Sequence, residues 1–227
     1  RELNASAQRR MAVLHPLRLV LDNWPTDELS RPVVEYFEVT NNPENADDGT
    51  RQVAFSGELW IEADDFAEVP PPKFFRLSPG REVRLRGAYL VTATSVDKDA
   101  EGNVVTVHAT YDPATRGGDA PDGRKVKSTM HWVSAAHAVD VTVALYERLF
   151  TTPVPGEATG EPLDDLNPHS RELVQGQAEA SLADIAPGQV VQFERLGYFA
   201  HDPDEHLLFH RTVGLRDEWA AIQRRQG

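Results

Sequence analysis

The chain has 227 residues, enough for one large or two small domains. Its net charge of -13 at pH 7 argues against a surface that is basic throughout, as general phosphate binding would need. The absence of cysteine excludes disulfides and thiolate metal sites, and no run of about 20 apolar residues or signal-peptide pattern occurs. We therefore expect a cytoplasmic protein that binds no membrane. Because the first residue is Arg1, we also expect a piece of a longer protein.

The first half of the chain begins with a helical pattern and then turns to strands. Residues 1–13, rich in alanine and arginine, predict a helix or the tail of one, which ends before Pro16. In 17–21, leucines alternate with other residues, the period of a half-buried strand. Gly57, inside the apolar stretch 53–61, predicts a bulge or a close backbone approach.

The remaining elements are almost all strands. Residues 81–111 predict a β-hairpin whose turn lies at 97–103. Further strands are predicted at 34–40, 126–133, 139–150, 171–180, 189–200 and 206–214, with a polar connection at 151–170 and a helix at 217–226. Many short strands with regular turns predict an all-β fold, and the length suits two small barrels better than one.

No pattern in the chain predicts catalysis or a metal site. His206 and His210 are four residues apart, but they flank a strand-like segment, where that spacing does not form a ligand pair. The adjacent acids Asp64 and Asp65 would point to opposite faces of a strand, which argues against an acid–base pair. We expect no active site and no cofactor in this chain.

One short window is basic although the whole chain is acidic. Residues 73–86 carry five basic side chains against the single acid Glu82, which gives a local charge of +4. The five are Lys73, Arg76, Arg81, Arg84 and Arg86. Such a stripe can bind RNA locally, and the alternative is a solvated strand face whose arginines pair with surface acids.

Five segments, in order and with matching spacing, resemble the glutaminyl-tRNA synthetase family over nearly the whole chain. They are RQVAFSGELWI (51–61), REVRLRGAY (81–89), DGRKVK (122–127), HWVSAAHA (131–138) and RTVGLRD (211–217). The resemblance implies the C-terminal anticodon-binding region, an all-β pair of small barrels related to the ribosomal protein L25 fold with short helical ends. It also implies a catalytic half outside this chain that charges glutamine tRNA with ATP and Mg²⁺.

The family resemblance further implies a domain plan and a partner. Residues 1–16 would end a helical connector, 17–72 with 150–216 would form the proximal barrel, 73–149 the distal barrel, and 217–227 a helical tail or linker. The partner would be the anticodon stem-loop of glutamine tRNA, bound by a monomer, with no role for DNA.

The resemblance also assigns the RNA-reading residues. Arg51 matches the family arginine at the middle anticodon base, and Gln192 and Arg195 match residues beside that base. Arg76 matches the arginine that reads the third base. Arg84 and Arg86 match residues around the first base, and Lys73 adds a further cation. An arginine fork can bond a base edge with two hydrogen bonds, worth roughly 1–3 kcal/mol. Phe74 and Phe75 stand where a relative has basic or tyrosine side chains.

Two alternatives share parts of this pattern. A glutamyl-tRNA synthetase of the archaeal or eukaryotic type has the same barrels, and its tRNA differs from glutamine tRNA at the third anticodon base. A free ribosomal-RNA-binding protein of the L25 type would have one barrel, whereas the strand segments here occur in a doubled set.

Overall fold

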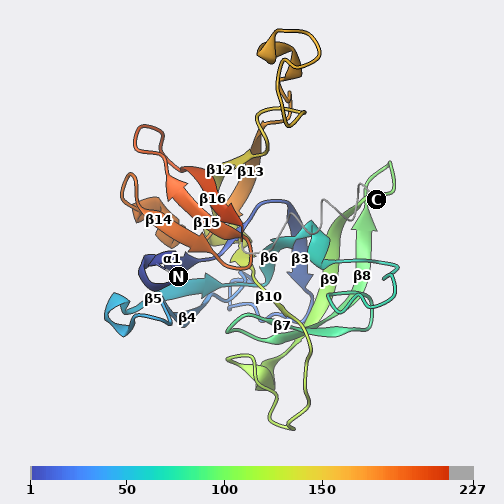
Figure 1. Ribbon diagram of the computed structural model, residues 1–227. Coiled ribbons are helices and arrows are strands. Elements are labelled where there is room, and N and C mark those ends of the chain that lie inside the picture. The colour runs from blue at the N-terminus through green and yellow to red at the C-terminus, as the bar shows by residue number, and fades with distance from the viewer. Residues whose placement is uncertain (1, 215–227) are drawn as a thin grey trace.

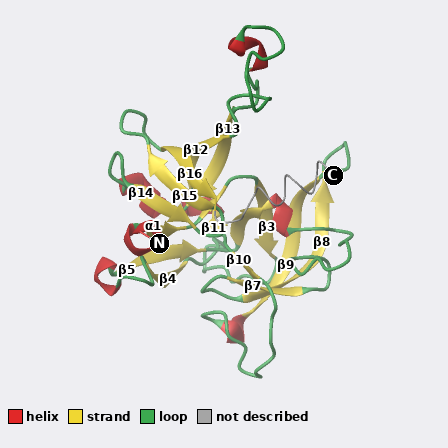
Figure 2. Ribbon diagram, viewed as in Figure 1, coloured by secondary structure: helices red, strands yellow, loops and turns green. Residues whose placement is uncertain are grey.

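The computed structural model describes residues 2–214, and almost all of its regular structure is strand (Figure 2). The strands of these residues form two seven-stranded sheets and one separate hairpin; Figure 1 shows their arrangement. The first sheet contains β1 (Gln8–Arg10), β2 (Ala12–Val13), β12 (Val139–Tyr146), β13 (Arg171–Ala178), β14 (Val190–Phe193), β15 (Gly197–His201) and β16 (Leu208–Gly214). The second contains β3 (Pro16–Leu21), β6 (Glu58–Glu62), β7 (Glu82–Leu85), β8 (Leu90–Lys98), β9 (Val104–Asp112), β10 (Thr129–Met130) and β11 (Val133–Ser134). The hairpin is β4 (Glu35–Thr40) with β5 (Thr50–Phe55).

Helical structure is confined to short pieces within residues 2–214. The one α-helix there is α1 (Glu2–Ser6). The 3-10 turns are η1 (Ala46–Asp48), η2 (Ala63–Asp65), η3 (Pro113–Thr115), η4 (Ala135–His137), η5 (Pro162–Asp165) and η6 (Ala180–Asp184).

Each large sheet is closed by one short segment that pairs with both of its edges. In the first sheet, β1 pairs with β14 and β2 with β13, and only Met11 separates β1 from β2. In the second sheet, β10 pairs with β7 and β11 with β6, and His131 and Trp132 lie between them. Closure removes the open sheet edges that would invite pairing with other chains.

The two sheets enclose separate apolar cores that share the segment closing the first sheet. Met11 and Val13 belong to the core of the second sheet, whereas Ala12 and Leu14 belong to the core of the first. Successive side chains of an extended segment point to opposite faces, so one strand serves both cores. The two barrels therefore share a common wall at 11–14.

Several sequence predictions are confirmed. The leucines of β3 are buried in alternation, and β8 and β9 pair as the predicted hairpin. Gly57 sits in close contact, since a Cβ built there would lie 2.9 Å from Cδ1 of Trp24. The approaching group is thus the Trp24 side chain.

Three predicted elements are wrong. The single strand predicted over 126–133 is two short strands, β10 and β11, with His131 and Trp132 between them. The predicted helix over 1–13 stops at Ser6, because Gln8–Arg10 pairs in parallel with β14 and this long-range ladder outweighs the local helix preference. The single strand predicted over 189–200 is two antiparallel strands, β14 and β15, joined by a tight turn. Arg195 in that turn has φ 68, a conformation for which glycine or asparagine would be the usual signal. The helix predicted at 217–226 lies outside the described residues.

Hydrogen bonding also groups the strands differently from the expected domain ranges. The strands within 17–72 were expected to join 150–216, but β3 pairs in parallel with β9 and antiparallel with β6. β12, inside the range 73–149, pairs with β13 and β16. These contacts join segments distant along the chain. Between β12 and β13 the chain extends away from both sheets as a long arm, visible at the top of Figure 1.

Over residues 2–214, no helix has both the length and the apolar character needed to cross a membrane.

Candidate RNA-binding surface

Two adjacent hollows lie where the turn after β14 faces β7 and β10. The first has a volume of about 540 Å³ and is lined by Lys73, Phe74, Phe75, Arg76, Lys127, Ser128, Thr129 and Arg195. The second has a volume of about 420 Å³, and its polar and charged lining includes Arg9, Glu38, Thr40, Arg84, Arg86, Thr129 and Glu194. Thr129 lines both hollows, so the two form one continuous surface. We call the basic side chains on it the cationic face: Arg9, Lys73, Arg76, Arg84, Arg86, Lys127 and Arg195.

The first hollow is organised around one buried carboxylate, that of Asp65. Arg195 donates to both of its oxygens, from Nη1 at 2.5 Å and Nη2 at 2.8 Å. Arg76 Nη1 lies 3.0 Å from Oδ1 of the same residue and also donates to the Asp64 carbonyl, 2.9 Å away. Asp65 is 1% exposed, while both arginines keep about a quarter of their side-chain surface exposed. One acid from η2 therefore orients two arginines from distant parts of the chain.

Arg195 also touches a second buried group. Its Nη1 lies 3.2 Å from Nδ1 of His131, and because a guanidinium can only donate, that imidazole nitrogen accepts. Burial lowers the pKa of Arg195, but the bonds to Asp65 and its negative charge outweigh burial and raise the pKa above its usual value. The group is a permanent cation held between two acceptors.

In the second hollow, the protein also holds Arg84, which belongs to β7, and Arg86, which lies in the turn after β7. The Arg86 guanidinium forms an ion pair with the buried carboxylate of Glu194. Arg84 donates from Nε to the Gly118 carbonyl, and its Nη2 lies 3.5 Å from Asp119. Both line this hollow, as their spacing predicts, and Val83 and Leu85 are buried on the opposite face of β7.

Arg51 lies behind this surface. Its side chain is 8% exposed and donates to both carboxylate oxygens of Glu179, at 2.5 and 2.8 Å. Its Nη1 donates to the carbonyl of Thr40, a residue that lines the second hollow. Burial, followed by the neighbouring charge of Arg51, lowers the pKa of Arg10 to about 10.

Gln192 and Arg9 are direct neighbours across the pairing of β14 with β1. Gln192 is 7% exposed and its Oε1 has no hydrogen-bond partner in the described part of the chain. The buried Nε of Arg9 is likewise without a partner there. A buried acceptor without a partner is costly, which points to a ligand or water that supplies the missing bond.

Arg9 is the residue that sequence reasoning missed. It falls in the segment predicted as helix, and nothing local distinguishes it from Arg10. Only the parallel pairing of β1 with β14 brings it beside Gln192 and into the hollow that holds Arg84 and Arg86. The alignment of a short strand with a partner some 180 residues away carries no local sequence signal.

The lysines of the cationic face differ from its arginines. Neither Lys73 nor Lys127 forms an ion pair within residues 2–214; Lys127 Nζ lies instead over the ring of Phe75, 5.3 Å from its centroid. Phe75 is 53% exposed, and Lys73 has φ 65, an uncommon conformation for a residue with a side chain. The first hollow thus offers two unpaired ammonium groups and an aromatic face.

Among the described residues, no group of three or more His, Asp or Glu is placed to share a metal ion.

Two family models match this architecture. Both carry the description "tRNA synthetases class I (E and Q), anti-codon binding domain", one over residues 7–112 and the other over residues 129–202. The chain belongs to this family. Except for Lys127, the cationic face lies within the matched ranges.

The relatives narrow the comparison. Over 97% of its length the chain is similar to the glutamine–tRNA ligases of Nitrobacter hamburgensis (54% identical) and Rhodopirellula baltica (49% identical). It is 47% identical, again over 97% of its length, to the glutamine–tRNA ligase of Escherichia coli O157:H7. The chain spans 39%, 37% and 39% of these three relatives, respectively.

Proposed function

We propose that this chain is the anticodon-binding part of a glutamine–tRNA ligase, and that the cationic face holds the anticodon loop of glutamine tRNA. The observation that carries this proposal is local. In a chain of net charge -13, basic side chains from both barrels converge on two adjoining hollows. RNA sequence is mostly read from unpaired loop bases, which such hollows can receive.

The paired arginines suit base recognition. Buried Asp65 and Glu194 fix the guanidinium groups of Arg76, Arg195 and Arg86, so little side-chain freedom is lost when RNA binds. Each guanidinium has five N–H donors, more than its partners in the protein use, and the remaining donors can bond a base edge. Gln192 lines neither hollow but neighbours Arg9 across the pairing of β14 with β1, and in this proposal its Oε1, which has no partner within residues 2–214, accepts a hydrogen bond from a base.

The unpaired groups suit the rest of a nucleotide. Among the residues that the structure describes, no carboxylate neutralises Lys73 or Lys127, so both attract phosphates. The exposed ring of Phe75 offers a stacking surface for a base, worth roughly 1–3 kcal/mol in other single-stranded RNA sites. Arg51 is paired with Glu179, and in this proposal it supports the wall of the second hollow without contacting RNA. Arg9, which lines that hollow, contacts the RNA instead.

In this proposal the protein that carries the chain attaches glutamine to its tRNA in the cytoplasm and acts as a monomer. ATP and Mg²⁺ would be used by parts of the protein outside this chain. The names of the relatives and the coverage of their sequences support this division.

The family covers both glutamate and glutamine synthetases, so the third anticodon base decides between them. Arg76→Ala should weaken binding of a glutamine anticodon stem-loop about fivefold to a hundredfold, because it removes one bidentate base contact. Discrimination between stem-loops that differ at the third base should fall as well. Equilibrium titration with four stem-loops, one for each third base, measures both effects.

The matched control is Arg18→Ala, which removes an exposed arginine paired with Glu58 that lines neither hollow. It should bind every stem-loop like the parent. If Arg76→Ala binds the stem-loops as tightly as the parent and discriminates the third base equally well, Arg76 does not read that base. Equal affinity of the parent protein for the glutamate and glutamine anticodons would count against the glutamine assignment.

A further inference from the structure

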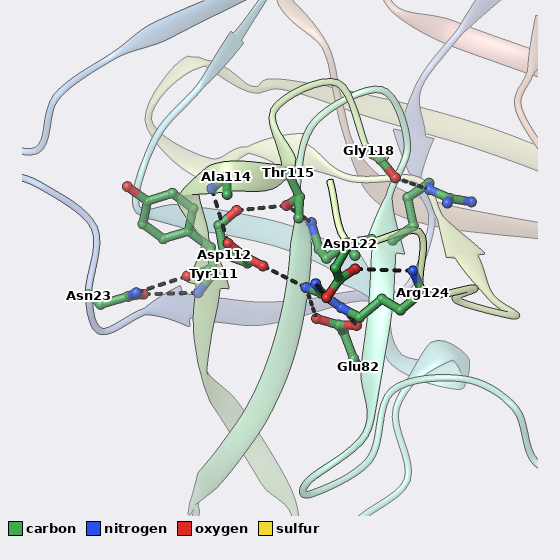
Figure 3. Close-up of polar contacts among 11 residues, drawn as sticks. Asn23, Glu82, Tyr111, Asp112, Ala114, Thr115, Gly118, Asp122 and Arg124 are labelled. Carbon is green, nitrogen blue, oxygen red and sulfur yellow. Dashed lines mark hydrogen bonds and ion pairs between the residues drawn. The ribbon is translucent and has the colours of Figure 1, made fainter. Parts of the chain in front are cut away.

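A surface loop beside the second hollow is fastened at both ends by one arginine. Arg124 donates to both oxygens of Glu82 at 2.9 Å, to Asp112 at 2.5 Å and to Asp122 at 2.7 Å (Figure 3). Glu82 belongs to β7, Asp112 ends β9 and Asp122 belongs to the loop itself. The residues from 113 to 124, here called the clamp loop, are therefore tied to two strands of the second sheet.

Hydrogen bonds inside the clamp loop leave it little freedom. Thr115 is fully buried; its hydroxyl donates to the Asp112 carbonyl at 2.6 Å and accepts from Leu90 N at 2.9 Å. Gly117 N donates to the Ala88 carbonyl, 2.7 Å away, and Gly118 N donates to the Thr115 carbonyl, 2.8 Å away. These bonds fix the position of the Gly118 carbonyl, which points back toward β7.

That carbonyl is the hydrogen-bond acceptor for Nε of Arg84 (Figure 3 shows the bond at Gly118). The contact is close on the side-chain face too, because a Cβ built on Gly118 would lie 3.0 Å from Cδ of Arg84. Unlike Arg76, Arg86 and Arg195, Arg84 has no buried carboxylate to orient it in the described part of the chain; the acid paired with it there, Asp119, is fully exposed and 3.5 Å away. The clamp loop therefore orients Arg84, as Asp65 and Glu194 orient the other arginines.

We propose that the clamp loop is a positioning element for RNA recognition, fastened by Arg124 and acting on Arg84 through the Gly118 carbonyl. The proposal rests on the proposed function and adds the positioning residues Gly118 and Arg124 to it. Holding a long side chain in its bound orientation before RNA arrives removes an ordering cost from binding. The expected contribution is about three- to tenfold in affinity.

Two neighbouring glycines provide a matched test. Gly117 and Gly118 have φ 93 and 94, so alanine strains the backbone alike at both, but a Cβ at Gly117 meets no atom within 4 Å. In the full-length protein, Gly118→Ala should bind a glutamine anticodon stem-loop at least about threefold more weakly than Gly117→Ala. In an Arg84→Ala background the two glycine variants should bind equally, because the positioned side chain is gone.

Arg124→Gln gives a second route to the same result, with the midpoint of thermal unfolding followed to confirm that it folds. It should weaken binding in the parent and have no further effect in Arg84→Ala. Equal binding by the two glycine variants in the parent background, or a difference that persists without Arg84, would overturn the inference. Parental affinity in Arg84→Ala would also overturn it, whereas the proposed function fails only if Arg76→Ala binds like the parent as well.

Discussion

Glu179→Ala should lower the free energy of unfolding by about 3–5 kcal/mol, the cost of breaking a buried ion pair from one side. Glu179 accepts two bonds from Arg51, one from the backbone N–H of Met11 and one from the hydroxyl of Ser181. Arg51 belongs to the β4–β5 hairpin, Met11 to the segment that closes the first sheet, and Ser181 to η6, which follows Glu179. The Glu179 carboxylate therefore joins three parts of the fold. Denaturant unfolding measures the loss.

The control for this variant is Glu58→Ala, which breaks the pair between Arg18 and Glu58 on the surface. Both partners there are 43% exposed, so the loss should be no more than about 1 kcal/mol. Glu179→Gln should fall between the two, since it keeps one acceptor oxygen, which can serve Met11, and loses the charge opposite Arg51. A loss for Glu179→Ala as small as that for Glu58→Ala would show that this buried pair does not hold the fold together.

Asp65→Asn should weaken binding of the anticodon stem-loop by about tenfold to a hundredfold, because it releases two arginines at once. The amide keeps one acceptor oxygen and replaces the other with a donor, which faces the N–H groups of Arg195 or Arg76. Removing the negative charge of Asp65 also leaves the positive charges of Arg76 and Arg195 close together with no carboxylate between them. Titration of the stem-loop, with unfolding followed in parallel, separates the binding loss from a loss of stability.

The neighbouring residue provides the control for that variant. Asp64 is exposed and reaches Arg76 only through its backbone carbonyl, which Asp64→Asn leaves in place. Asp64→Asn should therefore bind RNA like the parent. If Asp65→Asn and Asp64→Asn bind equally well, the orientation of Arg76 and Arg195 by Asp65 has no part in recognition.

The fold could be predicted from the sequence where the signal is local. Alternating burial along β3 and the turn between β8 and β9 depend on nearby residues, and both were predicted correctly. The strand β1 and the tight turn at Arg195 could not be predicted, because the first depends on pairing with β14 and the second on a non-glycine residue at positive φ. Local preference was overruled in both places by contacts between distant segments.

The surface could be predicted in part for the same reason. Their spacing in the sequence placed Arg84 and Arg86 on one face, and the structure has both in the second hollow, although β7 ends at Leu85 and Arg86 lies in the turn that follows. The basic stripe does not act as one unit, however, since Arg76 belongs to the first hollow and Arg81 bonds the Phe74 carbonyl. The acids that orient the arginines, Asp65 and Glu194, are recognisable only once distant segments are brought together.

The most direct test of the central claim places a photoreactive thiouridine at the middle anticodon position of a glutamine stem-loop and maps where it attaches to the protein. If the two hollows hold the anticodon, the label should attach within 8–10 or 190–195, the segments that carry Arg9 and Glu194 to the second hollow. Attachment confined to the far arm between β12 and β13, or to β4 and β5 away from Thr40, would contradict it.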